Sequence, residues 1–311
     1  MKTAPKTLAI GLMLAVSLHS AQAAQIAHTY VSGAGSAVDT NACTRSAPCA
    51  TFQGALANTA SGGVITALDA GDYGPVTVTS QSVTIDGTGA NVSLVVSNFS
   101  GSAVNISAGT NNTVILRHLA ITNVRVGDNF NNGVSLNSGN LIVDDCKISG
   151  FTSSGLLLNS SGNSVVENTT ITVCGSGILT SGMGLVSLRN VTLQGNRYGL
   201  DAEGGPVDIS HSQITQNSSY GLFAYGGSGS SGTLSASDCM VSGNSTGVFA
   251  ANGGLIRLTN NDIFNNMTGI DNNSSGKVDA TTGTVSTTGN NRKAGNATPG
   301  APTPGRVIAQ Q

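Results

Sequence analysis

Two carboxylic acids, Asp201 and Glu203, have the spacing in this chain that best suits acid–base chemistry. In a β-strand, residues two apart point to the same face, with their backbones about 6.8 Å apart. Such a pair could act as general acid and general base on a glycosidic bond, and Arg197 lies close by in the sequence. The separation falls between those of retaining and inverting glycosidases, so it does not select a mechanism. These three residues are the candidate catalytic residues.

Aromatic side chains gather around the same segment, although aromatic residues make up only 4% of the chain and tryptophan is absent. The candidates for a ligand-binding surface are Tyr198, Tyr220, Phe223, Tyr225 and Phe249. On one face of a sheet, these rings would form an apolar patch beside charged groups, which is typical of a saccharide-binding surface. The alternative is a sheet face whose rings pack under a loop, such as the glycine- and serine-rich residues 226–232.

A regular repeat predicts that these residues do share one face. Glycine followed by an aliphatic residue recurs every 22 residues, with a single interval of 26. The glycines of this series are Gly133, Gly155, Gly177, Gly199, Gly221, Gly247 and Gly269. After each glycine, apolar and polar residues alternate as in a half-buried strand, and two further short alternating runs follow. We therefore predict coils of three strands that stack at about 4.8 Å per coil, with equivalent side chains over one another.

A leucine-rich repeat is the rival architecture, because the segment from Leu188 to Asn196 fits its consensus. The rest of each unit fits poorly. Valine, isoleucine, serine and threonine outnumber leucine, and second and third alternating strands are present. The predicted fold is therefore an all-β solenoid of about nine or ten coils.

Stacking also predicts three ladders of polar side chains. The first consists of Asn196, Asn217, Asn244 and Asn266. The second consists of His118, Asp145, Asn168, Asn190, His211, Asp238 and Asn260. The third consists of Arg117, Asp144, Glu167 and Arg189. We expect left-handed backbone and mutual hydrogen bonds in the first ladder, a structural turn in the second, and ion pairs between neighbouring coils in the third.

The first 23 residues have the features of a secretory signal peptide. Lys2 and Lys6 form a positive start, an apolar run follows, and residues 21–23 (Ala-Gln-Ala) form a small-x-small cleavage site. The predicted location is therefore secreted or periplasmic. Removal of this segment takes two lysines and changes the net charge from −2 to about −4.

The remaining chain divides into a cap, a stack and a tail. The predicted parts are residues 24–63 as the N-terminal cap, 64–288 as the stack of coils and 289–311 as a flexible tail. Within the cap, Phe52 and Leu56 lie on one side of a short helix that could cover the open end of the stack. The interval before Gly133 is ten residues too long, which predicts a projecting loop around residues 125–132.

Cysteines and charge limit the remaining function classes. Cys43 and Cys49 lie six residues apart in a proline-containing loop of an exported protein, so we predict a disulfide bond between them. The other three, Cys146, Cys174 and Cys239, are expected to be small buried apolar residues. No cysteine or histidine spacing supports a metal site, and we predict no cofactor. Charged residues are only 9% of the chain, without a basic cluster, which argues against nucleic acid and membrane partners.

Three features near the N-terminus are Tyr30-Val31-Ser32-Gly33, the Cys43–Cys49 loop and Asp69-x-Gly71-x-Tyr73. Together with the repeat, they resemble secreted bacterial proteins of the right-handed parallel β-helix, or pectin-lyase-like, superfamily. The resemblance covers roughly residues 50–285. It implies a right-handed β-helix and a possible polyuronate substrate, since the superfamily includes pectate lyases, polygalacturonases and epimerases. Of their catalytic motifs only Asp144-Asp145 is present, and a strand would point these two side chains to opposite faces.

Our leading functional hypothesis is a non-catalytic extracellular or periplasmic binding or surface module, with a carbohydrate polymer as its candidate ligand. The alternative is a polysaccharide-active enzyme, either a polyuronate lyase or a glycoside hydrolase. A third hypothesis is a structural or adhesive role, in which the long side of the stack is the functional surface. The sequence does not indicate an oligomeric state.

Overall fold

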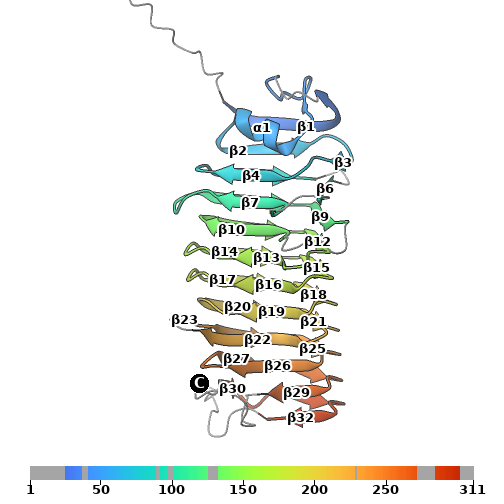
Figure 1. Ribbon diagram of the computed structural model, residues 1–311, viewed down its shortest axis with the longest axis vertical. Coiled ribbons are helices and arrows are strands. Elements are labelled where there is room, and N and C mark those ends of the chain that lie inside the picture. The colour runs from blue at the N-terminus through green and yellow to red at the C-terminus, as the bar shows by residue number, and fades with distance from the viewer. Residues whose placement is uncertain are drawn as a thin grey trace, which may run out of the picture.

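The protein is a single column of stacked coils (Figure 1). The computed structural model describes residues 25–36, 41–88, 92–96, 101–124, 132–227, 230–271 and 284–301. The column begins with β1 (Ile26–Ser36) and α1 (Phe52–Asn58) at one end, and its other end holds β32 (Thr298–Gly300). Each coil contributes one strand to each of three sheets that run the length of the column.

The first sheet contains eleven strands. After β1 they are β2 (Thr59–Ala67), β5 (Val83–Asp86), β8 (Thr113–Arg117), β11 (Asn140–Asp144), β14 (Ser164–Glu167), β17 (Val186–Arg189), β20 (Pro206–Ser210), β24 (Thr233–Ser237), β27 (Leu255–Thr259) and β30 (Thr284–Thr287).

The second sheet contains ten strands, in agreement with the number of coils expected from the repeat. They are β3 (Gly71–Asp72), β6 (Val92–Val96), β9 (Leu119–Asn123), β12 (Lys147–Ser149), β15 (Thr170–Thr172), β18 (Thr192–Gln194), β21 (Gln213–Thr215), β25 (Met240–Ser242), β28 (Asp262–Phe264) and β31 (Arg292–Ala294).

The third sheet faces the viewer in Figure 1. Its strands before β32 are β4 (Val76–Thr79), β7 (Val104–Ser107), β10 (Val134–Ser138), β13 (Ser154–Leu158), β16 (Ser176–Thr180), β19 (Tyr198–Ala202), β22 (Tyr220–Gly227), β26 (Thr246–Ala251) and β29 (Thr268–Asp271). A short strand, β23 (Ser230–Ser231), pairs antiparallel with the end of β22. All other pairings in this sheet are parallel, so the predicted stacking of coils is confirmed.

The register of the pairing follows the sequence repeat. Leu200 of β19 pairs with Leu222 of β22, which in turn pairs with Val248 of β26. These side chains point inward and are fully buried. Burying one such aliphatic side chain contributes about 1.5–3 kcal/mol, and the column repeats this contribution in every coil.

The repeated glycine is required by the close approach of successive coils. A Cβ atom on Gly199 would lie 2.6 Å from the carbonyl oxygen of Gly221 and 2.8 Å from the side chain of Ile214. Both distances are shorter than a van der Waals contact, so a side chain would force the coils apart. The period of 22 residues therefore marks the point in each coil where only glycine fits.

The first polar ladder is buried and hydrogen-bonded, as expected, but its predicted backbone conformation was wrong. The backbone N–H of Asn196 donates to Oδ1 of Asn217, and that of Asn217 donates to Oδ1 of Asn244, both at 3.0 Å. The left-handed residue is the one before each asparagine, for example Gly195 (φ 66°) and Gln216 (φ 57°). The asparagines therefore close the turn with their amides and do not supply its backbone bend.

The second ladder supplies left-handed backbone at the turn between the first and second sheets. All seven of its residues have φ between 47° and 56°. Asparagine and aspartate tolerate this region better than most residues, and the two histidines occupy the same structural position. The expected turn is confirmed.

The N-terminal end of the column is covered as predicted. Helix α1 begins after Thr51, whose hydroxyl accepts a hydrogen bond from the backbone N–H of Gly54 at 2.9 Å. Phe52 and Leu56 are buried against the first coils, and a disulfide bond joins Cys43 to Cys49. The helix thus covers apolar surface that an open stack would expose.

The C-terminal boundary at residue 288 was placed too early. Strands β31 and β32 pair with β28 and β29, so the stack continues to Gly300. The predicted signal peptide, nearly all of the projecting loop at residues 125–132, and residues 302–311 of the predicted tail lie outside the described residues.

Candidate functional site

Five aromatic side chains lie together on the outer face of the third sheet, and we call them the aromatic stripe. They are Tyr198, Tyr220, Phe223, Tyr225 and Phe249. They belong to the neighbouring strands β19, β22 and β26, where Tyr198 pairs with Tyr220 and Phe223 pairs with Phe249. The regular repeat places these residues on one face, as the sequence predicts.

The rings of the aromatic stripe are in direct contact. The ring planes of Tyr198 and Tyr220 differ by 13°, with centroids 5.4 Å apart, and those of Phe223 and Phe249 differ by 9°, with centroids 5.3 Å apart. Tyr220 joins the two pairs through Phe249, at 4.6 Å between centroids. Offset stacking of this kind contributes about 0.5–1.5 kcal/mol per pair beyond burial. All five side chains remain partly exposed, so the stripe both stabilises the sheet and presents apolar surface.

Arg197 lies at one end of the stripe. Its guanidinium carbon is 4.8 Å from the centroid of the Tyr198 ring, which is a cation–π contact. The side chain is exposed and places a positive charge beside the rings.

Asp201 is buried beside the aromatic stripe. It pairs in register with Leu179 in one neighbouring coil and Phe223 in the other, and only 5% of the residue is exposed. Its Oδ1 atom is buried without a hydrogen-bond partner. Burial, together with the negative charge of Glu203, raises the pKa of Asp201 to about 7, although a hydrogen bond from Ser176 lowers it. The carboxyl group is therefore largely protonated in mildly acidic solution.

Glu203 follows the end of β19 and is only half-buried. The structure thus places both predicted carboxylates on the same side of the sheet but at different depths. A ligand on the surface would reach Glu203 directly and Asp201 only if the neighbouring side chains moved.

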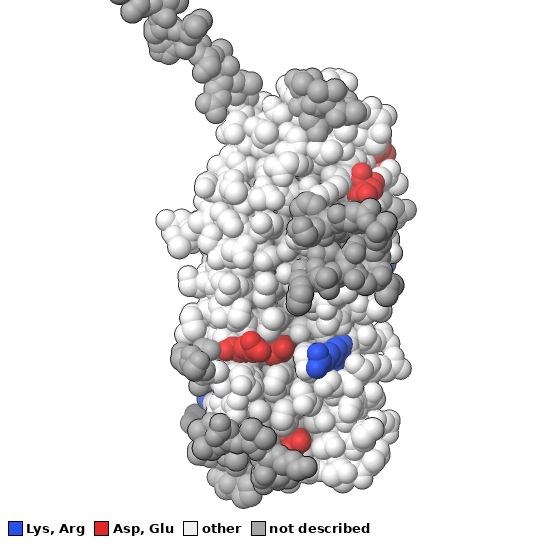
Figure 2. Space-filling view, viewed as in Figure 1, with Lys and Arg blue, Asp and Glu red and all other residues white. Residues whose placement is uncertain are grey.

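The rest of this face is almost uncharged (Figure 2). In the described parts of the third sheet, the charged residues within strands are Asp201 and Asp271, and those directly flanking strands are Arg197 and Glu203. Figure 2 shows an acidic and a basic patch side by side on this face, one acidic patch below them and another near the upper right edge.

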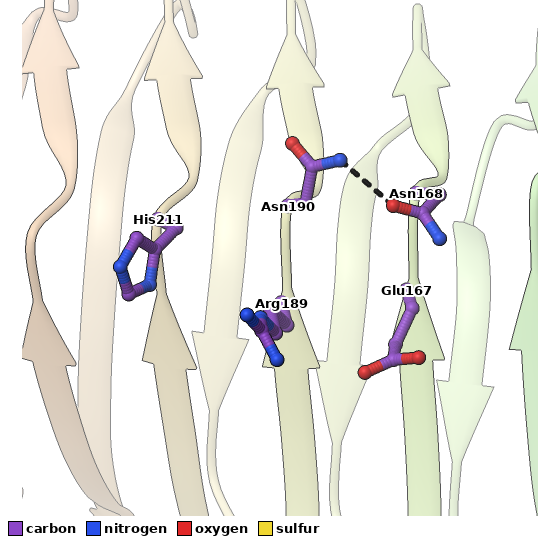
Figure 3. Close-up of a pocket in the computed structure, with 5 residues that line it drawn as sticks. All are labelled: Glu167, Asn168, Arg189, Asn190 and His211. Carbon is purple, nitrogen blue, oxygen red and sulfur yellow. Dashed lines mark hydrogen bonds between the residues drawn. The ribbon is translucent and has the colours of Figure 1, made fainter.

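A second, more polar surface lies along the turn between the first and second sheets. One hollow of about 370 Å³ is lined by Glu167, Asn168, Arg189, Asn190 and His211 (Figure 3). The side-chain amide of Asn190 donates to that of Asn168 at 2.7 Å. Glu167 and Arg189 are register partners in β14 and β17, as predicted.

The ion pairs expected in the third ladder are not formed. Arg117 and Asp144 are also register partners, but neither they nor Glu167 and Arg189 approach within ion-pair distance in the described structure. In Figure 3 the Arg189 side chain extends outward and does not bend toward Glu167. Exposed pairs contribute little, so side-chain entropy and hydration outweigh the attraction.

A second hollow on this surface, of about 510 Å³, is lined by His118. The contacts of His118 with Asp86 and Thr88 were not predicted from the sequence. Nδ1 of His118 lies 2.9 Å from Oδ1 of Asp86 and 2.8 Å from Oγ1 of Thr88. Its Nε2 is 3.9 Å from Asp145, and Lys147 also lines the hollow. Burial raises the pKa of Asp86, but hydrogen bonds from Thr88 and His118 outweigh it and leave this pKa below its usual value. Among the described residues, no group of three or more histidine, cysteine or acidic side chains could hold a metal ion.

The three cysteines outside the disulfide, Cys146, Cys174 and Cys239, are buried as expected. Burial raises the pKa of the Cys146 thiol to about 12. A thiol in this state is a poor nucleophile, so these cysteines serve the core.

The family model described as "Right handed beta helix region" matches residues 81–234 of the chain. The sheets described above have this architecture, so the fold of the protein is a right-handed parallel β-helix. No curated protein matches the sequence.

Solved structures resemble the fold at low sequence identity. Pectate lyase Pel9A is 13% identical, with a TM-score of 0.54 over 92% of this chain and 79% of the lyase. XylC, solved in complex with xylose, is 12% identical, with a TM-score of 0.56 over 86% of this chain and 68% of XylC. The A-module of the Azotobacter vinelandii mannuronan C-5 epimerase AlgE4 is 14% identical, with a TM-score of 0.44 over 80% of this chain and 91% of the module. At 13% and 12% identity, the first two structures show a likeness of fold alone.

The one helix within the described residues, α1, is too short to cross a membrane.

Proposed function

We propose that this protein is an exported, non-catalytic binding or surface module that holds a carbohydrate polymer on the face of its third sheet. The observation that carries the proposal is the aromatic stripe, in which five partly exposed rings contact one another on the outer face of one sheet. The features of residues 1–23 support export to the periplasm or beyond.

The chemistry of the stripe suits a sugar. Pyranose rings have apolar C–H surfaces and polar hydroxyl edges, and the stripe offers exposed ring surface next to tyrosine hydroxyls, Glu203 and Arg197. Successive coils repeat at about 4.8 Å, a distance comparable to one sugar unit. A polymer lying along the column would therefore meet equivalent side chains at regular intervals.

The fold comparisons agree with this proposal at a coarse level. A pectate lyase and a protein bound to xylose share the architecture, and both names refer to carbohydrates. At 13% and 12% identity they support a carbohydrate-related fold and leave the ligand to direct measurement.

Affinity electrophoresis of the purified protein through gels containing soluble polysaccharides tests the proposal. We expect at least one polysaccharide to retard the protein, and the double variant Tyr220→Ala with Phe223→Ala to lose most of that retardation. Phe264→Ala is the matched control, because Phe264 is a half-buried aromatic residue on the second sheet. Circular dichroism establishes that each variant is folded. Equal retardation of the double variant and the wild type would contradict the assignment of this face.

A polysaccharide-active enzyme, either a polyuronate lyase or a glycoside hydrolase, is the second candidate, favoured by one observation. Burial raises the pKa of Asp201 to about 7, which is suitable for a general acid near neutral pH. Glu203 and Arg197 would complete such a site, and substrate binding would have to uncover Asp201. Incubation with pectate, alginate and xylan, followed by absorbance and reducing-end assays, tests this function. Activity no higher than that of Asp201→Ala would exclude it.

A further inference from the structure

Among the residues that the structure describes, the charges on the third-sheet face are few and mostly negative. From β4 to β32, the described strands and the residues directly flanking them contain three acids and one base. The acids are Asp201, Glu203 and Asp271, and the base is Arg197. In Figure 2 acidic patches likewise outnumber basic ones on the described part of this face.

Two of these acids adjoin the aromatic stripe directly. Asp201 pairs in register with Phe223, and Asp271 pairs with Phe249. Arg197, the single cation in the described part of this face, lies against Tyr198 at the opposite end of the stripe from Asp271. A polymer that covers the rings would therefore pass over the buried Asp201, with Glu203 within reach at one end and Asp271 beside Phe249 at the other.

This arrangement is unfavourable for an anionic polymer. A polyuronate carries one carboxylate on every sugar, and proteins normally meet such groups with arginine forks, lysines or a bound cation. Here the guanidinium of Arg197 alone would face the carboxylates of the polymer. The acidic side chains of the protein would repel these carboxylates at contact distance. The described residues also lack a group of three or more side chains that could hold a bridging metal ion.

An uncharged polymer faces none of these penalties. Its hydroxyl groups can donate hydrogen bonds to Glu203 and Asp271 and accept them from Arg197. Burial raises the pKa of Asp201, and a neutral ligand over this carboxyl does not add a further charge to its surroundings.

We infer that the ligand of the aromatic stripe is an uncharged polysaccharide, such as a neutral xylan, glucan or mannan, and that polyuronates are rejected. This inference rests on the proposed function. The distribution of carboxyl groups and Arg197 on the third-sheet face would select the class of polysaccharide that binds.

The test compares two sets of polymers with the same protein. Isothermal titration and affinity electrophoresis are carried out with unsubstituted xylan, β-glucan and galactomannan, and with polygalacturonate and alginate. The polyuronates are tested both with EDTA and with added Ca²⁺. We expect an uncharged polymer to bind at least about tenfold more tightly than either polyuronate, and Tyr220→Ala with Phe223→Ala to lose that binding.

A charge-reversal variant makes the test specific. Glu203→Lys combined with Asp271→Lys leaves every ring in place but gives the face a net positive charge. We expect this variant to gain polyuronate binding that weakens with added salt. No gain of polyuronate binding by the folded variant would overturn the assigned role of these carboxyl groups.

The outcomes separate the inference from the proposed function. Binding of a polyuronate by the wild type that equals or exceeds uncharged polymers, with dependence on Phe223, would overturn the ligand class and leave the binding function standing. Binding of neither class would overturn both. Selective binding of an uncharged polymer that Tyr220→Ala with Phe223→Ala abolishes and Phe264→Ala preserves would support both.

Discussion

Phe223 lies directly over Asp201, because the two residues are register partners in the parallel pairing of β19 with β22. This relationship places an ionisable carboxyl group next to an aromatic ring and leaves only 5% of Asp201 exposed. An outward-facing acid of a β-helix would normally be hydrated. Here neighbouring coils remove the water, and the pKa of the group rises to about 7.

The raised pKa of Asp201 predicts a pH-dependent stability. The folded protein keeps this proton up to about pH 7, whereas the unfolded chain loses it near 3.8. Stabilisation by the protonated group is therefore complete below the unfolded pKa and is lost as pH rises through the folded pKa, by an amount on the order of a few kcal/mol. Asp201→Asn stays neutral at every pH, so its free energy of unfolding should fall less between pH 4 and pH 8.

Urea denaturation at several pH values measures this slope. Asp208→Asn is a suitable control, because Asp208 is an exposed acid on the neighbouring strand β20. It should retain the wild-type pH dependence. A slope for Asp201→Asn that matches the wild type would show that Asp201 is ionised in the folded protein at low pH.

The buried asparagine ladder predicts a large cost for removing one amide. Asn217 accepts a hydrogen bond from the backbone N–H of Asn196 and donates one to the carbonyl oxygen of Leu193. Asn217→Ala leaves both groups buried without these partners, which should lower the free energy of unfolding by about 1–3 kcal/mol. Ser218→Ala changes the adjacent exposed residue and should have little effect. Equal urea midpoints for the two variants would contradict a stabilising ladder.

The close approach of coils at the repeated glycine predicts that even one methyl group is harmful there. Gly199→Ala would place its Cβ 2.6 Å from the carbonyl oxygen of Gly221, which belongs to a backbone that cannot move independently. We expect a loss of about 1–3 kcal/mol in thermal or urea unfolding. Gly33→Ala serves as control, since the nearest atom to its Cβ would lie 3.7 Å away. A Gly199→Ala protein as stable as this control would contradict the packing argument.

The aromatic stripe could be predicted from sequence because its coils follow the repeat closely. Strict spacing fixes the register, and alternation fixes the side of the sheet on which Tyr198, Tyr220 and Phe223 lie. The extent to which each outward side chain is buried could not be predicted in the same way. Alternation indicates that Asp201 points outward, but its burial depends on the size of the side chains in the two neighbouring coils, Leu179 and Phe223.

Features outside the regular repeat were harder to predict for identifiable reasons. The contact of His118 with Asp86 spans the irregular coils before Gly133, where spacing gives no register. The exposed strand β31 carries no apolar signal, so the stack appeared to end before it. At the asparagine ladder, composition could not show which of two consecutive turn residues adopts the left-handed conformation. In each case the deciding information lies in neighbouring coils and not in the local sequence.

Val173 supplies a final prediction, because its conformation is unfavourable for a β-branched residue. It has φ 56° and is 67% exposed, so little packing compensates for the strain. At the equivalent position, two of the next four coils use glycine, Gly195 (φ 66°) and Gly243 (φ 68°), and none uses a β-branched residue. Val173→Gly should therefore stabilise the protein by about 1 kcal/mol in urea denaturation. Val165→Gly removes the same side chain from β14, where the backbone is extended, and should destabilise it by about 0.5–1 kcal/mol. Destabilisation by both variants would refute the strain at Val173.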